Sequence, residues 1–360
     1  MYGLCADTHF HAWSLFASQD EDGVNTRLKG TLREFRRMCE TVSKAGGERV
    51  YIAGDTFHVR GNIKPSVMNP TVSEMIGCAT YLDLEIRIMP GNHDLEGKEV
   101  TFSGSSIIPL ANATGECQDV MIIQQPHFFD DDMVAIVPWQ STREGLISAI
   151  KDLSKSIIKE GHDLDQVDLH LHTGINGVII GMPDHAWAPE ELAQFGFKRV
   201  FCGHYHHHKV FEIKDCQVVS IGSLTHQTWS SVGTISGWIM VTDDVFEHNE
   251  TKAPKFMDFS DDHEIEDFEG NYVRVRGIEL DEKEIRQLKQ GLEDAGAKGV
   301  VIHAIAKSKV TTRSGGTPGK SVKMETSITD WITANEDITG ADEKSVADEA
   351  MDVLSMARSS

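Results

Sequence analysis

Short apolar segments that end in polar residues recur along the first 245 residues of this chain. They read YGLCADTH from residue 2, RVYIAGD from 49, LEIRIMPGNHD from 84, QVDLHLHTG from 166 and KRVFCGHYH from 198. Between the first two, apolar residues recur at helical spacing, at Leu28, Leu32, Phe35, Cys39 and Val42. Strands that alternate with amphipathic helices predict an α/β fold.

Further elements complete this pattern. Strands are predicted at DVMIIQQ, DMVAIVPW, QVVSIGS and GWIMVTDD, which begin at residues 119, 132, 217 and 237. One helix is predicted around residues 70–82, and another is expected to begin at a capping box of Ser141 and Glu144 and to reach about residue 160. Because the late strands follow one another without helices, part of the sheet system is expected to be antiparallel.

The composition changes after residue 245, and this change predicts the domain organisation. Residues 246–269 are rich in acids and irregular, which is typical of a linker. A strand, a helix over 281–295 and a strand then predict a small α+β unit. The expected segments are a main domain over 1–245, the linker over 246–269, the small unit over 270–306, a basic glycine-rich loop over 307–325 and two tail helices over 326–360.

Several classes of protein are disfavoured by composition. No run of 18 apolar residues is present and the first residues do not resemble a secretory signal, so we expect a cytoplasmic protein with no membrane contact. The cysteines form no CxxC pair, which predicts reduced thiols that fill the core: Cys5, Cys39, Cys78, Cys117, Cys202 and Cys216. A net charge of −22 argues against a protein that coats nucleic acid with its whole surface.

Five polar clusters lie at or just beyond the ends of predicted strands. They are Asp7-Thr8-His9, Gly54-Asp55, Gly91-Asn92-His93-Asp94, His172 and Gly203-His204-Tyr205-His206. Each cluster alone has an ordinary explanation as a turn or a polar strand end. All five in this order are far less expected by chance, because metal sites assemble in loops above a rigid sheet edge.

Two choices among histidines follow from strand geometry. In a strand-like segment His204 and His206 share one face, whereas His207 points the other way and His208 lies too far along. His170 competes with His172 on the same face, and we favour His172 because HTG marks the end of its strand.

The residue types of these clusters suit a binuclear metal centre. Carboxylate, imidazole and amide ligands together favour borderline divalent ions such as manganese, iron or zinc. Two ions about 3.5–4 Å apart require a bridging carboxylate and can activate a hydroxide. Asp55 is the best bridge, because a strand end holds it in a central position. Glycines beside the ligands allow the backbone and a phosphate to approach closely.

With all five motifs in place, the chain resembles the calcineurin-like metallophosphoesterases. Within that superfamily it is similar to the nuclease subunits of the SbcCD type, which include bacterial SbcD, the meiotic-recombination-eleven proteins and the T-even phage recombination nuclease subunits. GDTFHVRGNIKPS from residue 54, IVPW from 136, the small unit after 270 and the helical tail carry this closer resemblance. In length and tail the phage-type subunits are the most similar.

The resemblance implies a role for each site residue. The first ion would be held by Asp7, His9, Asp55 and His206. The second would be held by Asp55, Asn92, His172 and His204. His93 would face the scissile phosphate, stabilise its charge and assist the leaving group, and Asp94 would orient its ring. His58 would position the substrate.

The resemblance also implies a fold, a reaction and partners. It implies a four-layer α/β/β/α sandwich with a small cap domain and a helical tail, and two manganese ions. The activity would be hydrolysis of DNA phosphodiesters in a recombination or double-strand-break repair complex with an SbcC-type coiled-coil ATPase. Homodimers are common in this family. The exonuclease or endonuclease preference is left open.

Alternatives remain beside this interpretation. The chain could be another calcineurin-like phosphatase or a small-molecule phosphodiesterase, or an inactive scaffold that retains the fold. His11 follows the first motif where the family often has glycine, and it is either a substrate contact or, as we favour, a polar surface residue. DNA contacts or solvated surface could both explain two basic groups, which are Arg27, Lys29, Arg33, Arg36 and Arg37 in one helix and Lys307, Lys309, Arg313, Lys320 and Lys323 in the late loop.

Overall fold

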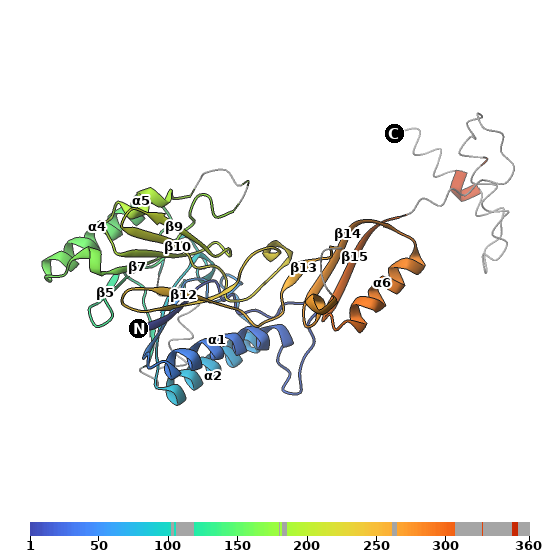
Figure 1. Cartoon of the computed structure of the whole chain (residues 1–360), viewed down its shortest axis with the longest axis horizontal. Helices are drawn as coiled ribbons and strands as arrows, with labels where there is room; N and C mark the ends of the chain where they lie inside the picture. Colours follow the sequence, from blue (N-terminus) through green and yellow to red (C-terminus); the bar gives the residue numbers. More distant parts are fainter. Residues whose placement is uncertain are drawn as a thin grey trace. The chain divides into compact units, whose positions relative to one another are not determined.

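The protein is described here by a computed structural model (Figure 1). It describes residues 1–101, 104–105, 119–179, 181, 186–260, 265–306, 326 and 348–351. The chain forms two compact units, Met1–Ala306 and Lys307–Ser360. The basic loop and nearly all of the tail predicted from sequence lie outside the described residues, so the architecture below is that of the first unit.

The first sheet has six strands in the order β12-β11-β1-β2-β3-β4. These are β1 (Tyr2–Cys5), β2 (Arg49–Ala53), β3 (Glu85–Met89), β4 (Val120–Ile122), β11 (Gly237–Val241) and β12 (Phe246–Glu250). Strands β1 to β4 are parallel, whereas β11 is antiparallel to both β1 and β12. Helices α1 (Thr26–Lys44) and α2 (Pro65–Leu82) pack on one face of this sheet.

The second sheet also has six strands, in the order β5-β6-β7-β8-β10-β9. These are β5 (His127–Phe129), β6 (Val134–Val137), β7 (Asp168–His172), β8 (Arg199–Gly203), β9 (Lys209–Ile213) and β10 (Cys216–Ser220). Its four central strands are parallel, and its outer strands β5 and β9 are antiparallel to their neighbours. Helices α4 (Arg143–Lys159) and α5 (Pro189–Ala193) cover its outer face.

Apolar side chains divide the molecule into layers. Leu4 and Tyr51 of the first sheet pack against Val134 and Phe201 of the second, so the two sheets face each other. Separate apolar clusters join each sheet to its own helices. Figure 1 shows the two helix pairs on opposite sides of the sheets. The predicted α/β/β/α sandwich is therefore confirmed.

A third, smaller sheet follows. It has the parallel order β13-β14-β15, from β13 (Phe256–Asp258), β14 (Tyr272–Leu280) and β15 (Gly299–Ala306), and helix α6 (Glu282–Asp294) packs on it. The loop after β1 contacts this sheet, because Phe16 stacks on Tyr272 with ring centroids 4.9 Å apart. The Arg27 guanidinium lies 5.6 Å from the Tyr272 ring centroid. The small α+β unit thus packs directly against the loops of the main domain.

The prediction of an irregular linker over residues 246–269 is wrong for two segments. Strand β12 extends the first sheet, and β13 belongs to the third. Strand β12 was not predicted because its sequence is rich in acidic residues. A strand at a sheet edge exposes polar side chains on one side, and on the other side Phe246 packs on Phe201 with ring centroids 5.5 Å apart.

Two helix starts also differ from the prediction. Helix α2 begins at Pro65 rather than near residue 70. Proline is favourable at the start of a helix, because the backbone N–H that it lacks would have no hydrogen-bond partner within the helix at that position. The cap of α4 is Thr142, whose hydroxyl accepts from the Gly145 amide at 3.1 Å, and Ser141 instead donates to Glu99.

Five of the six cysteines lie in the described part of the chain. Cys5, Cys39, Cys78, Cys202 and Cys216 are all free and buried, which agrees with their prediction as reduced core residues, and Cys117 lies outside the described residues. No described helix combines the length and the hydrophobicity that crossing a bilayer requires.

Candidate active site

The five predicted clusters meet where β1, β2, β3, β7 and β8 end. Main-chain hydrogen bonds continue past the first two strands, from the Asp7 amide to Gly54 and from the His9 amide to Asp55, both at 3.0 Å. Asp7, His9, Asp55 and His204 have φ angles of 50°, 42°, 53° and 101°. Such left-handed conformations are costly for residues with side chains and concentrate at functional sites.

One group of ligand atoms consists of Asp7, His9 and His206. The Nε2 atoms of both histidines lie 3.7 Å from Asp7 Oδ1 and 3.1 Å from each other. Asp7 is fully buried, and its Oδ1 has no hydrogen-bond partner. An unpaired carboxylate oxygen in the protein interior is costly unless a cation balances it.

A second group consists of Asp55, His172 and His204, with Asn92 beside it. The Asn92 side-chain oxygen lies 2.9 Å from His204 Nδ1 and 3.2 Å from His172 Nε2. His172 Nδ1 donates to the Ala53 carbonyl at 2.8 Å, so its Nε2 is left to face the cluster. A main-chain carbonyl that fixes the tautomer is a common support for histidines that bind metals.

Asp55 lies between the two groups. Its Oδ2 is 3.6 Å from His9 Nε2, and its Oδ1 is 3.3 Å from His172 Nε2. The main-chain amide of His93 donates to the same Oδ1 at 2.8 Å and holds the carboxylate in this orientation. One carboxylate that presents one oxygen to each group has the geometry of the predicted bridge.

The electrostatics of these residues also fit divalent cations. Burial, reinforced by the charge of Asp55, raises the pKa of Asp7 to about 8. Burial lowers the pKa of His204 to about 3 and that of His206 to about 4, so these rings are neutral donors. For His172 burial acts to lower the pKa, but the Asp55 carboxylate outweighs it and raises the pKa to about 9. The donor set thus favours a positive charge at His172, and a divalent cation, which binds the neutral imidazole, would supply that charge in place of the proton.

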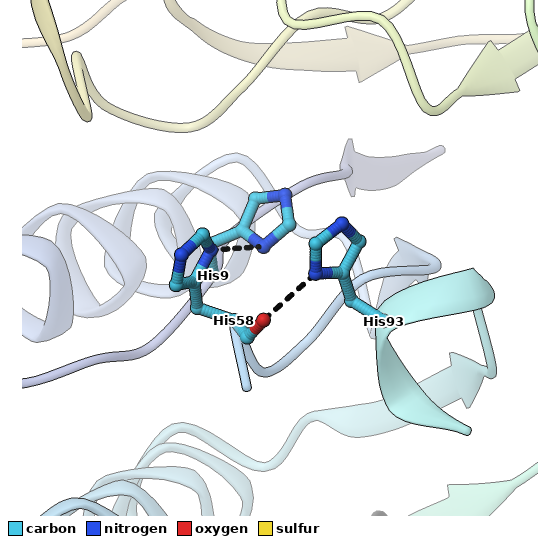
Figure 2. Close-up of side chains that lie close together, drawn as sticks. All are labelled: His9, His58 and His93. Atoms are coloured by element: carbon cyan, nitrogen blue, oxygen red, sulfur yellow. Dashed lines mark hydrogen bonds between the residues drawn. The ribbon is translucent and has the colours of Figure 1, made fainter. Parts of the chain in front are cut away.

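His93 stands beside the two groups with a defined orientation, and its ring forms a third set of closely spaced nitrogen atoms with His9 and His58 (Figure 2). Its Nδ1 donates to the His58 carbonyl at 2.7 Å, which leaves Nε2 as the reactive nitrogen. The His58 ring stacks on the His93 ring with centroids 5.5 Å apart, and its Nδ1 lies 3.4 Å from His9 Nδ1. His58 therefore positions His93 through both its carbonyl and its ring.

The predicted role of Asp94 needs correction, since the His58 carbonyl holds the His93 ring. The Asp94 carboxylate accepts from the amides of Thr56, Phe57 and Gly91 at 2.9–3.1 Å. It therefore connects the loop after β2, which carries Asp55, to the loop after β3, which carries His93.

The argument that selected His204 and His206 was wrong in its premise, although both reach the site. Strand β8 ends at Gly203, so residues 204–208 are not pleated. His208 lies elsewhere and stacks on His248 with ring centroids 4.0 Å apart. His170 is buried between the sheets, where its Nε2 lies 3.1 Å from the Tyr2 hydroxyl.

Aromatic residues around the site were not predicted from sequence. Trp139 and Tyr205 lie 5.6 and 5.2 Å from the His204 ring, and Trp13 lies 4.5 Å from the His58 ring. Trp139 belongs to the IVPW segment, whose position at a strand end was the available signal.

Gly91 leaves the space that the Asp55 carboxylate occupies between the two ligand groups. A Cβ atom on this residue would lie 2.2 Å from Asp55 Oδ1 and 2.3 Å from the Asp55 amide nitrogen. We expect Gly91→Ala to displace the carboxylate and to weaken metal affinity about 10–100-fold, as disturbed ligand supports do. Manganese titration of the purified variant measures this. Gly97→Ala is the matched control, because nothing lies within 4 Å of its added Cβ, and equal affinities of both variants would contradict the argument.

The two groups should lose their ions independently. We expect His206→Ala and His204→Ala each to reduce the bound metal from two equivalents to one, because each residue lies in a different group. Elemental analysis after desalting measures the stoichiometry. His207→Ala and His208→Ala are the neighbouring controls and should retain two equivalents; a loss in either control would show that the ligand assignment is wrong.

The fold and the site together define a metal-dependent phosphoesterase. The sequence model of the calcineurin-like phosphoesterase family matches residues 2–208, and the chain belongs to this family. No curated protein sequence matches the chain significantly.

Solved structures that resemble the chain are distant in sequence. A dimetal phosphatase of Danio rerio is 10% identical, with a TM-score of 0.44 over 66% of this chain and 90% of that chain. An archaeal phosphodiesterase is 16% identical, with a TM-score of 0.30 over 62% and 83%. A phosphopantetheinyl hydrolase of Mycobacterium tuberculosis is 11% identical, with a TM-score of 0.35 over 62% and 89%.

Proposed function

We propose that this chain is a DNA nuclease that hydrolyses phosphodiester bonds with two divalent ions, manganese in the first place, as the nuclease subunit of an SbcCD-type complex. The observation that carries the proposal is the placement of His58. This histidine follows Gly54-Asp55, as in the nuclease branch that the sequence resembles, and it stacks on His93. The same ring contacts Trp13, whose loop continues to Phe16 and the third sheet.

This continuity favours an extended substrate. The loop after β1 lies between the histidine site and Tyr272 of the third sheet. Residues that line the path from the site to that sheet could contact a polymer beyond the scissile bond. A small phosphorylated molecule would need only the histidine site itself, so the small unit supports a nucleic-acid substrate.

The residues of the site would divide the reaction between them. Bound divalent ions would neutralise the phosphate and activate a water molecule for attack. His93 Nε2 can carry a proton toward the leaving oxygen, because its Nδ1–H is already engaged by the His58 carbonyl. In its protonated form the His93 ring would stabilise negative charge on the phosphate. His58 keeps the ring in place through its carbonyl and by stacking.

The basic helix offers less to DNA than its sequence indicated. Arg36 pairs with Glu74 at 2.6 Å, Arg37 with Glu34 at 2.7 Å, and Lys29 with Asp20. The Arg27 side chain is mostly buried and donates to main-chain carbonyls. We therefore propose that neutralisation of DNA charge depends on the metal centre and on a basic groove of the ATPase partner.

The direct test is incubation of the purified chain and manganese with linear duplex DNA, circular single-stranded DNA or p-nitrophenyl phosphate. We expect the chain to cleave DNA and a chelator to abolish this cleavage. Cleavage of the circular DNA would show that the chain also has endonuclease activity. Hydrolysis of p-nitrophenyl phosphate alone would identify a phosphatase and refute the nuclease. No hydrolysis of any substrate would support an inactive scaffold.

The partner proposal rests on the tail sequence. Ile328, Trp331 and Ile332 form one apolar group, and a second stripe at helical spacing comprises Val346, Ala350, Val353, Leu354 and Ala357. Isolated helices of this length are marginal in water, so they must bury these stripes. Packing on the small unit would also bury them, but we propose docking on the coiled-coil root of the ATPase.

Truncation separates the partner contact from catalysis. A chain that ends at Thr326 retains the compact unit Met1–Ala306 and should keep manganese-dependent cleavage of single-stranded DNA. It should lose capture by the cognate ATPase and any digestion of duplex ends that ATP stimulates. A pull-down with full-length chain as the control measures binding, and full capture of the truncated chain would refute tail docking.

A further inference from the structure

Two aromatic pockets adjoin the histidine site, each through its own set of ring contacts. The first has a volume of about 420 Å³, and its walls include Phe10, His11, Trp13 and Phe57. The second has a volume of about 270 Å³, and its walls include Trp139, Trp187 and Tyr205. Small-molecule sites in proteins typically occupy about 300–1,000 Å³, so the first is of ligand size and the second approaches it.

The first pocket is one ring away from the catalytic histidine. Trp13 and His11 lie with their ring centroids 4.5 and 5.0 Å from that of His58. His58 in turn stacks on His93. Polar groups complement the aromatic wall, because Asn62 and Lys64 line the same pocket. A flat heterocycle with hydrogen-bonding edges, joined to a nearby phosphate, matches this combination.

The second pocket adjoins the ligand group of Asp55, His172 and His204, because His204 is part of its wall. Trp139 and Tyr205 both lie against the His204 ring, at 5.6 and 5.2 Å. The wall is firm, because Trp187 is buried and the Arg143 guanidinium lies 3.8 Å from its ring centroid. Asp55 presents one oxygen to His172 of this group and the other to His9, whose ring lies 5.2 Å from that of His58.

This arrangement distinguishes a diester from a monoester. A phosphate monoester has one organic substituent and would require a single pocket beside the metal centre. A phosphodiester has two organic substituents, and two aromatic pockets that adjoin the centre through different histidines can accept both. In an intact duplex the bases are paired and stacked, so they could not enter pockets that lie to either side of the phosphate.

We propose that the two pockets are nucleobase subsites, and that the centre cleaves an unpaired strand with one flanking base on Trp13 and the other on Trp139. This inference rests on the proposed nuclease function and names the form of its substrate. His11, which we had favoured as a surface residue, then belongs to the wall of the first subsite. Stacking of a base on an aromatic side chain is sequence-tolerant, so the subsites would bind unpaired strands of many sequences.

A cycle of protein and substrate changes tests the subsites. The substrate is a single-stranded thymidine dodecamer in which one linkage is a phosphodiester and the others are methylphosphonates, so that only one bond can be cut. Two analogues lack the base on one side or the other of that bond. Stacking contributes about 1–3 kcal/mol per base, which corresponds to about 5–150-fold in kcat/KM. We expect each missing base to reduce the activity of the unaltered chain by a factor in this range.

The tryptophan variants should each be insensitive to one missing base. Trp13→Ala should lower kcat/KM for the complete substrate by a similar factor. For this variant, removal of the base that would stack on Trp13 should cause no further decrease in kcat/KM. Removal of the base on the other side of the bond should still lower it. Trp139→Ala should show the opposite pattern. Trp13→Phe retains a stacking ring and should recover most of the activity, which separates stacking from general loosening of the loop. Tyr81→Ala removes an aromatic side chain that is 84% exposed on α2 and should change nothing.

The outcomes separate this inference from the function on which it rests. If the unaltered chain does not cut the complete dodecamer, the proposed nuclease function fails and the subsites fail with it. If the chain cuts the dodecamer but both tryptophan variants respond to each missing base as the unaltered chain does, only the subsites are refuted. Equal cutting of a fully paired duplex, with the same dependence on both tryptophans, would also refute the unpaired substrate.

Discussion

Asp55→Ala should abolish hydrolysis and remove both metal equivalents, because this one carboxylate presents an oxygen to each ligand group. Loss of a single acid–base group typically costs about 10²–10⁴ in rate, and loss of both ions should cost more. Elemental analysis and the DNA cleavage assay measure the two effects on the same preparation. We expect the two losses to occur together rather than separately.

The control for this variant is Asp152→Ala on α4. That carboxylate is 66% exposed and pairs with Lys155, so its loss removes one negative charge without touching the site. Circular dichroism should show both variants folded. If Asp55→Ala retained two equivalents of manganese, Asp55 could not be the bridge.

His93→Ala should lower the rate about 10²–10⁴-fold while metal content stays at two equivalents. The ring donates to the His58 carbonyl and is absent from both groups that contain Asp7 and Asp55. Its removal therefore takes away a proton carrier and leaves both of these groups in place. Single-turnover cleavage with saturating enzyme reports the chemical step directly.

A substitution at the neighbouring histidine distinguishes catalysis from positioning. His58→Ala keeps the main-chain carbonyl that holds His93 Nδ1 but removes the stacked ring. Its rate should fall less than that of His93→Ala. An empty metal centre in the His93 variant would show that the division of roles is wrong.

Much of the fold was predictable because strands and helices of the main domain follow local patterns. Most of the buried central strands are short apolar runs, and the polar clusters lie at or just beyond the ends of strands. The edge strands β9 and β12 escaped prediction, since only one face of each contacts the core and the other carries polar residues. Prediction therefore succeeded for the buried strands and for the apolar edge strand β4, and it missed the more polar edge strands.

The candidate site shows the same division. The residue types and their order were sufficient to predict which side chains converge, and His172 was separated from His170 by its position at the end of β7. The left-handed backbone at Asp7 and His204, and the carbonyl that orients His93, depend on contacts between segments far apart in the chain. Such contacts cannot be read from the local sequence. For this reason the assumption that residues 204–208 form a strand and the role given to Asp94 were wrong.

The unpaired Oδ1 of buried Asp7 has a thermodynamic consequence for the chain as a whole. Any ligand that binds only the folded form shifts the folding equilibrium toward it, by about 2.7 kcal/mol when its concentration is 100 times its dissociation constant. Folding and ion uptake would then be linked, because bound ions would stabilise the folded chain and offset the cost of its left-handed backbone at the site. The supply of divalent cations around the protein would set not only how fast it works but also how much of it remains folded to resist proteolysis.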